Sequence, residues 1–164
     1  HRRHAAAHLG VGSGMANFGV NISGLSDLLR IERIDLPGEI KQAMDTAMED
    51  GEDALKEAIN TRGTGREWTR PWGASGRTGS SPGRVDTGEM LTKAKGATTN
   101  VARHEVDGVL GWPEDSEEYI AYQDQGFEHV ITGEYIEGMM ALRDSAELAE
   151  RSLVNELENI ARKF

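Results

Sequence analysis

Apolar residues recur at steps of three and four along two long stretches of the chain, the spacing that places them on one face of an α-helix. The first stretch predicts a helix over about residues 37–60, because Pro37 suits a first helical position and Glu39 suits the positive end of a helix. The second predicts a helix over residues 139–164. The apolar positions are Ile40, Ala43, Met44, Ala47, Met48, Gly51, Leu55, Ala58 and Ile59 in the first helix, and Met139, Leu142, Ala146, Ala149, Leu153, Leu157, Ile160 and Phe164 in the second.

Shorter patterns predict further elements on both sides of the first helix. Residues 18–22 alternate apolar and polar side chains, as a short strand does. After a break at Gly24, residues 25–33 fit a short helix. Residues 119–127 fit either one helical turn or a strand that ends near Gly126, and the pattern leaves both interpretations open.

A pair of strands is predicted in the second half of the chain. Residues 90–99 and 101–112 are rich in Thr and Val, and a polar turn near residues 99–100 would join them as antiparallel neighbours, with a kink at Gly108. Residues 129–138 are expected to form a loop before the last helix.

The first residues of the chain lack any such pattern. Residues 1–14 are basic and histidine-bearing and then glycine-rich, so we expect a flexible segment over about residues 1–19 and a single domain over residues 20–164. The sequence also fits a functional start at Met15, with upstream sequence before it. A helix would put three histidines on one face, but no Cys or carboxylate lies nearby to complete a metal site: His1, His4 and His8.

A long loop separates the first helix from the predicted strands. Residues 61–86, hereafter the arm, lose all periodicity and fill with Gly, Ser, Thr and Pro. Loops of this length inside a compact domain are uncommon and are either functional or disordered. Because large aromatic side chains are enriched where protein surfaces meet, the cations and indoles of the arm are the candidate interface residues: Arg62, Arg66, Trp68, Arg70, Trp72, Arg77 and Arg84.

The order of these elements predicts an α+β fold. We expect a small, mostly antiparallel sheet packed with two long amphipathic helices, and a long extended loop. The apolar stripes are rich in Ala and Met, and aromatic residues make up only 5% of the chain, so the core of an isolated subunit is expected to be thin. Association between copies of the chain would cover more of it.

Composition narrows the possible functions. The 164 residues suffice for one domain, and a formal net charge of -10 disfavours tight binding of duplex nucleic acid. No apolar run is long enough to span a bilayer, so no membrane partner is expected. The chain has no Cys, which excludes disulfides and thiolate metal sites.

The sequence offers no convincing catalytic constellation. The glycines of the arm are not followed by the Lys-Ser or Lys-Thr of a phosphate-binding loop, and His104-Glu105 lacks the second His of a zinc-binding helix. Asp86-Thr87-Gly88 is similar to the aspartic-protease triplet, but that mechanism needs two such carboxylates. We therefore expect no catalytic, metal or cofactor site, and not an enzyme.

Two partners could use the cations of the arm. Arginines interleaved with indoles suit single-stranded nucleic acid, with the cations on phosphates and the rings stacked on bases. They also suit an acidic protein surface, and the acids between Asp45 and Glu57 of another copy provide one. The acidic character of the rest of the chain favours self-association.

Five stretches, in matching order over about residues 20–164, resemble the neck or minor tail proteins that join head to tail in long-tailed bacteriophages. These stretches are VNISGLSDLLRIE, AMDTAMEDGEDALKEAI, RVDTGEMLTKA, YIAYQDQGFEH and YIEGMMALRDSAELAERSL. In that family an Asp-Thr-Gly step leads from a long loop into the sheet, and a Tyr-x-x-Tyr-x-x-x-Gly step closes the last sheet element. The matching positions are Asp86, Thr87 and Gly88, and Tyr119, Tyr122 and Gly126.

The resemblance implies a structural virion protein without catalytic residues. Its partners would be copies of itself in a ring of six or twelve subunits, the adjacent head-closure and tail proteins, and genome DNA that passes through the channel without sequence-specific binding. It would be found at the head–tail junction of the virion, and in the host cytoplasm during assembly. The chain has Asp124 to Phe127 where relatives carry Glu-Phe-Gly-Thr, and Tyr135-Ile136 where they have a Pro-rich approach to the last helix, which leaves neck, tail-completion and tail-terminator positions open.

Overall fold

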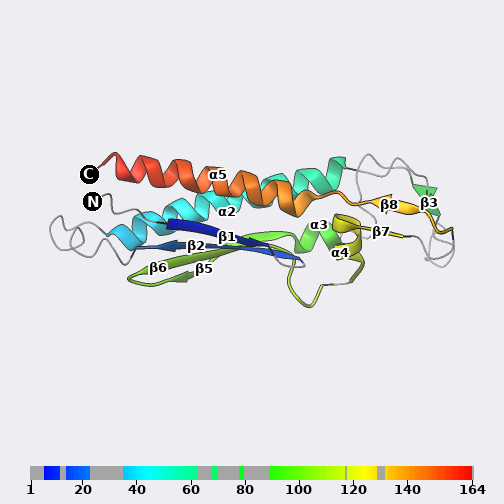
Figure 1. The fold of residues 1–164 in the computed structure, drawn as a ribbon, viewed down its shortest axis with the longest axis horizontal. Helices are drawn as coiled ribbons and strands as arrows, with labels where there is room; N and C mark the ends of the chain where they lie inside the picture. Colours follow the sequence, from blue (N-terminus) through cyan, green and yellow to red (C-terminus); the bar gives the residue numbers. More distant parts are fainter. Residues whose placement is uncertain are drawn as a thin grey trace.

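A four-stranded antiparallel sheet forms the centre of the fold, with strand order β1-β2-β6-β5 (Figure 1). The strands are β1 (Ala6–Val11), β2 (Met15–Asn21), β5 (Lys95–Val101) and β6 (Glu105–Gly111). The computed structural model describes residues 6–11, 14–22, 35–62, 68–69, 78–79, 89–116, 118–128 and 132–163. The short helix expected over residues 25–33 lies outside these described ranges.

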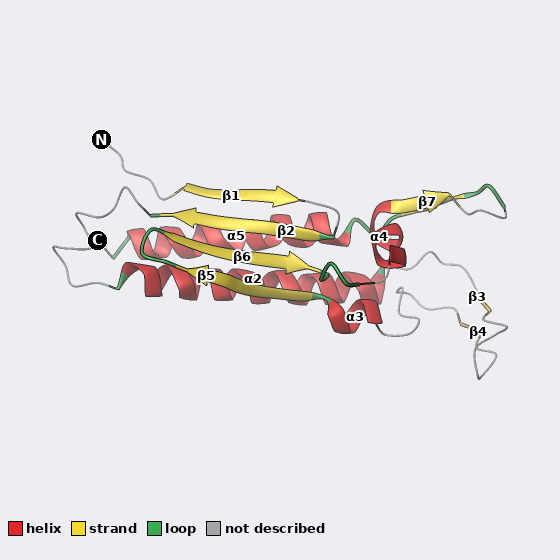
Figure 2. Ribbon diagram, turned by 90° about the horizontal axis from the view of Figure 1, so that it is seen from below, coloured by secondary structure: helices red, strands yellow, loops and turns green. Residues whose placement is uncertain are grey.

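Two long helices lie side by side on one face of the sheet. Helix α2 (Leu36–Thr61) packs on β5 and β6, and helix α5 (Ala141–Ala161) packs on α2 and β2. Figure 2 shows both helices behind the sheet, with no described element over its other face. The arrangement confirms the predicted α+β fold, and α2 matches its predicted bounds within one residue at each end.

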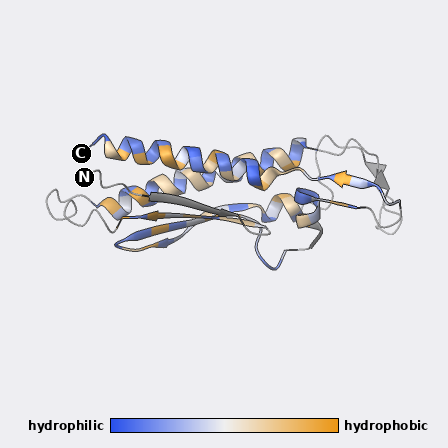
Figure 3. Cartoon of the chain, in the orientation of Figure 1, coloured by the Kyte–Doolittle hydropathy of each residue, from blue (hydrophilic) through white to orange (hydrophobic). Residues whose placement is uncertain are grey.

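The core lies between the sheet and the two helices. Alternate residues of β2, namely Ala16, Phe18 and Val20, are buried under the helices, whereas Asn17 and Asn21 are exposed on the opposite face. Each helix packs against the sheet through its apolar stripe. In Figure 3, hydrophobic residues lie beside hydrophilic ones along both helices. Every predicted stripe residue of α2 is buried, because the three- and four-residue spacing matches the helical turn.

The prediction of a flexible segment over residues 1–19 is wrong for the residues that the structure describes. Residues 6–11 form β1 and pair in register with residues 16–21 of β2. Phe18 is only 3% exposed. Without β1, the outer edge of β2 would present a row of unpaired backbone groups, so an N-terminal strand can pair there whatever its composition. His8 lies in this strand, so the helix that would align three histidines does not form at this position, while His1 and His4 lie outside the described residues.

The predicted antiparallel pair is confirmed, but its bounds differ. Residues 89–93 form helix α3 (Glu89–Lys93) rather than the start of a strand, and buried Met90 accepts a 2.9 Å hydrogen bond at its carbonyl from the Trp112 indole. The turn lies at residues 102–104, because the pairing of β5 with β6 continues beyond a register shift between Thr98 and Asn100. That shift is a local irregularity that the Thr- and Val-rich composition does not reveal.

The remaining elements gather at one end of the molecule. Helix α4 (Glu118–Gln125) is followed at once by β7 (Gly126–Glu128), which pairs with β8 (Tyr135–Glu137), and Figures 1 and 2 show this hairpin projecting beyond the ends of the long helices. The helical interpretation of residues 119–127 is therefore right up to residue 125, and the loop prediction is wrong at β8. The arm also contains a short antiparallel ladder, β3 (Trp68–Thr69) with β4 (Thr78–Gly79), so its predicted lack of regular structure is wrong there.

Candidate assembly interface

The structure describes only some of the residues that the sequence singled out. Arg62 caps the C-terminal end of α2, and Trp68 lies in β3. The remaining interface candidates and the Asp-Thr-Gly motif lie outside the described ranges: Arg66, Arg70, Trp72, Arg77, Arg84, Asp86, Thr87 and Gly88. Their role at an interface therefore stays a prediction.

Both family-like motifs were expected to border the sheet; the first is followed by helix α3, and the second runs through α4 into strand β7 of the two-stranded β7–β8 sheet. The residue after Gly88 begins helix α3, and strand β5 starts only at Lys95. Tyr119 and Tyr122 lie on α4, where Ile120 and Asp124 are buried at the four-residue spacing of one helical face. Gly126 opens β7 with a φ of +93°, a conformation that glycine adopts at the abrupt change from helix to strand.

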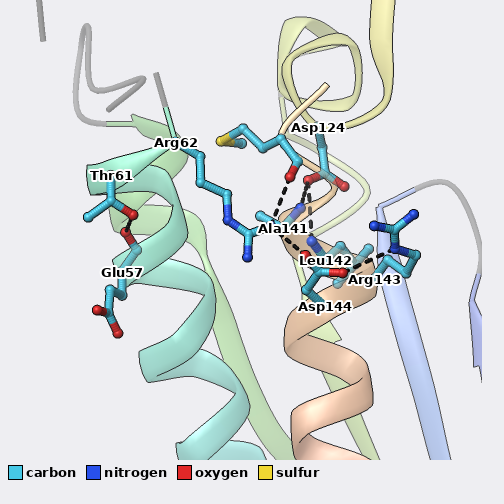
Figure 4. Close-up of polar contacts among 9 residues, drawn as sticks. Glu57, Thr61, Arg62, Asp124, Ala141, Leu142, Arg143 and Asp144 are labelled. Carbon is cyan, nitrogen blue, oxygen red and sulfur yellow. Dashed lines mark hydrogen bonds and ion pairs between the residues drawn. The ribbon is translucent and has the colours of Figure 1, made fainter. Parts of the chain in front are cut away.

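Arg62 joins the end of α2 to the start of α5. Its Nη1 donates a 2.9 Å hydrogen bond to the carbonyl oxygen of Met139 and a 2.6 Å bond to Oδ2 of Asp144 (Figure 4). Arg62 was predicted to be a cation of the arm that contacts a partner. It is bound within the chain, and so fixes where the arm leaves the helical layer.

The ion pair affects the titration of Asp144. The hydrogen bond from Arg62 lowers the pKa of this carboxyl below its usual value of 3.8, and outweighs the partial burial that acts in the opposite direction. A carboxyl with a depressed folded-state pKa contributes stability that is fully present above its unfolded value. That contribution is lost as the pH falls below about 4 and through the folded-state pKa.

Arg62→Gln should therefore lower the free energy of unfolding at neutral pH by no more than about 1 kcal/mol, because the pair is partly exposed. The difference from the wild type should shrink as the pH falls below about 4, which urea unfolding at a series of pH values would measure. Arg143→Gln is the matched control, since Arg143 contacts the same carboxylate at 3.1 Å from a more exposed position and should have a smaller effect. Equal losses for Arg62→Gln at pH 3 and pH 7 would contradict this account.

Asp124 is the main structural residue that the sequence did not reveal. Its side chain is only 6% exposed, and its Oδ1 accepts hydrogen bonds from the backbone N–H groups of Ala141 at 2.8 Å and Leu142 at 3.2 Å (Figure 4). These N–H groups lie in the first turn of α5, where the helix itself offers them no acceptor. The carboxylate of Asp124 on α4 therefore caps a helix that begins 17 residues later. A local capping pattern cannot signal such a distant cap.

The backbone reinforces the junction between α4 and α5. The N–H of Met139 bonds to the carbonyl oxygen of Gln123 at 3.1 Å, and the N–H of Met140 bonds to that of Asp124 at 2.9 Å. Met140 has a φ of 51°, the left-handed region that a methionine enters only when its surroundings require it. The base of the hairpin is therefore held firmly against the start of α5.

The projecting hairpin carries exposed aromatic residues. Phe127 and Ile136 are cross-strand partners on one face, and the Phe127 ring lies 6.2 Å from that of Tyr122 on α4. Tyr135 pairs with Glu128 on the other face. Tyr122 is 52% exposed and Tyr135 is 62% exposed. We call these four residues, Tyr122, Phe127, Tyr135 and Ile136, the hairpin patch; apolar and polar residues do not alternate regularly around Gly133, so periodicity gave no signal for it.

The patch belongs to the most acidic part of the chain. Residues 104–142 contain ten Asp and Glu and neither Lys nor Arg. Among them, Glu114, Asp115 and Glu128 are exposed on the described surface next to α4 and on the hairpin. The hairpin and the turn before α4 therefore present acids that suit a cationic partner, and Arg62 and Arg143 lie at the start of α5 beside the base of the hairpin.

The acids of α2, which were the predicted acceptor for a neighbouring arm, are partly engaged within the chain. They line a polar groove of about 290 Å³ beside β5. Asp45 binds Lys41 and accepts from the Thr98 hydroxyl, and Glu52 binds Lys56 and accepts a 2.8 Å bond from the Gly96 N–H. Burial raises the pKa of Glu52, but the bonds from Gly96 and Lys56 outweigh it and lower the pKa below the usual value. Glu52 therefore also satisfies an outward N–H of the edge strand.

The described residues provide neither a cluster of metal ligands nor a membrane-spanning helix. The described ranges bring no three His, Asp or Glu side chains together as metal ligands. Within those ranges, no helix combines the length and the apolar character needed to cross a membrane. No protein-family model, curated protein or solved structure matches the chain.

Proposed function

We propose that this chain is a structural protein of a tailed-bacteriophage virion, one subunit of a ring around the DNA channel that joins head and tail. The observation that carries the proposal is the projecting hairpin, on which Tyr135 is 62% exposed at a distance from the core. Two short strands are marginally stable alone in water, and exposed aromatic residues mark protein interfaces. The hairpin is therefore interpreted as a contact element, completed by a neighbouring subunit or ring.

The layering of the fold supports the same function. Helices cover one face of the sheet, whereas the other face exposes Asn17 and Asn21 and has no described element above it. Identical subunits that contact each other head to tail close into a ring when the rotation between them permits. Such an assembly would use the uncovered surfaces of each subunit, namely the projecting hairpin and the sheet face opposite the helices.

The charge of the chain suits a DNA conduit. A formal net charge of -10 repels phosphates, so DNA could slide past the subunits without being held. The copy number, six or twelve, and the position as neck, tail-completion or tail-terminator protein are parts of the same proposal.

Light scattering and negative-stain imaging of the purified protein test the proposal. We expect a concentration-dependent closed assembly of uniform mass with a central channel. In the phage, replacing the arm residues Arg66, Trp68, Arg70 and Trp72 with Ser should leave filled heads and tails that fail to join. Normal infectious particles from that mutant would overturn the proposed role.

A nucleic-acid-binding accessory protein is the second candidate, favoured by the five arginines and two tryptophans of the arm. Binding of single-stranded DNA that weakens steeply with salt, and that is lost when the five arginines become Ser, would support it. The contact of Arg62 with Asp144 within the chain leaves one cation fewer for phosphates.

A further inference from the structure

We propose that the hairpin patch of one subunit is the docking site for the arm, residues 61–86, of a neighbouring subunit. The inference names the contact between subunits, and so rests on the proposed ring assembly. It places the acceptor on α4 and the hairpin, and not on the acids of α2 that the sequence suggested.

The patch has the chemistry that the side chains of the arm require. Tyr122 on α4 and Tyr135 on β8 are both more than half exposed. Guanidinium groups stack on tyrosine faces, and indoles pack against aromatic rings at tilted angles. The arm supplies both groups, since it holds five Arg and two Trp.

Charge complementarity selects the arm from the other parts of the chain. The arm has five Arg against two acids, a net charge of +3, whereas residues 104–142 have ten acids and no Lys or Arg. Arg62 is bound to Asp144, so the cations assigned to the contact are the other four arginines of the arm, Arg66, Arg70, Arg77 and Arg84. On the acceptor side, Glu128 is exposed on the hairpin, and Glu114 and Asp115 are exposed in the turn before α4.

The alternative acceptor on α2 is engaged in part, because two of its acids have partners within the chain, whereas Glu49, Asp53 and Glu57 are exposed. Asp45 and Glu52 there already bind Lys41 and Lys56, and both also accept hydrogen bonds from β5. A guanidinium would have to displace these partners. By contrast, contacts of Asp124 and Met140 hold the base of the hairpin against the start of α5, so the fold sets where the hairpin projects.

Charge exchange between two variants tests the contact. The first variant reverses the arm with Arg66→Glu, Arg70→Glu and Arg77→Glu. The second reverses the acceptor with Glu114→Lys, Asp115→Lys and Glu128→Lys. Each variant alone brings like charges together, so its association constant should fall about a hundredfold. An equimolar mixture should recover assembly, because each arm then meets an acceptor of opposite charge on the other variant.

The matched control reverses exposed acids of α2 with Glu49→Lys, Asp53→Lys and Glu57→Lys, and should assemble like the wild type. Light scattering reports the mass in each case, and circular dichroism reports that each variant is folded. Recovery in a single chain that carries both reversals, without recovery in the mixture, would place the contact within one subunit and overturn the inference. Loss of assembly in the α2 control alone would overturn it in favour of α2.

The proposed function and this contact can fail separately. A wild-type protein that stays monomeric at all concentrations overturns ring formation, and the contact with it. A wild type that assembles, together with arm and acceptor variants that assemble equally well, overturns only the contact.

Discussion

Replacing Asp124 with alanine is expected to lower the free energy of unfolding by about 2–3 kcal/mol. The substitution removes an acceptor that two backbone N–H groups at the start of α5 share, and it does so at a position only 6% exposed. Water cannot readily replace a partner at such a position, so the donors lose their hydrogen bonds without compensation. Thermal unfolding followed by circular dichroism should show a melting temperature about 5–10 °C lower.

Two controls separate the cap from a general effect of the substitution. Asp124→Asn keeps a carbonyl oxygen and should lose less stability than Asp124→Ala. Asp35 caps the N-terminus of α2 through a 3.1 Å bond from the Gly38 N–H, but it is exposed, so Asp35→Ala should cost about 1 kcal/mol or less. Equal losses of unfolding free energy for Asp124→Ala and Asp35→Ala would show that burial does not increase the contribution of the Asp124 cap to stability.

The sequence predicted the elements whose pattern is local. The stripe from Ile40 to Ile59 fixes the face of α2 that packs, because each apolar residue follows the previous one by a helical turn. The strand around Phe18 and Val20 and the antiparallel partners in residues 95–111 were also found, because alternation and β-branched residues are local signals.

Elements that depend on distant partners were missed. Strand β1 forms because it pairs with the edge of β2. Its own sequence, AAHLGV, gives little indication of a strand. Helix α3 was assigned to a strand because Met90 and Leu91 fit both structures, and the hydrogen bond from the Trp112 indole to the Met90 carbonyl is a tertiary contact. Asp124 caps a helix across 17 residues, a relationship that no motif encodes.

The candidate site was predicted in part. The sequence marked the arm by its cations and its acidic surroundings, and the structure adds that Arg62 is bound to Asp144. The sequence suggested the acids of α2 as the acceptor; the structure adds that Asp45 and Glu52 have partners within the chain, and the place of the acceptor stays a prediction. The exposure of Tyr122 and Tyr135 at the projecting hairpin also depends on tertiary structure, since helical or strand periodicity alone does not show which face remains uncovered.

Gly96→Ala is expected to be strongly destabilising, with a loss of about 3 kcal/mol in the free energy of unfolding. Strand β5 passes so close to α2 that a Cβ at Gly96 would overlap the backbone carbonyl of Met48. A backbone group within a helix cannot move aside, so α2 would have to shift away from β5. That shift would also lengthen the 2.8 Å bond from the Gly96 N–H to Glu52.

Gly108→Ala is the matched control, because this glycine lies on the neighbouring strand opposite Thr98 and under the same helix. Its added Cβ would meet the thioethers of Met44 and Met48, which are flexible and can adjust, so the expected loss is about 1 kcal/mol. Urea unfolding of both variants measures the difference. If Gly96→Ala were no less stable than Gly108→Ala, contact between β5 and the α2 backbone would not set the spacing of the two layers, and side-chain packing in the core would have to set it instead.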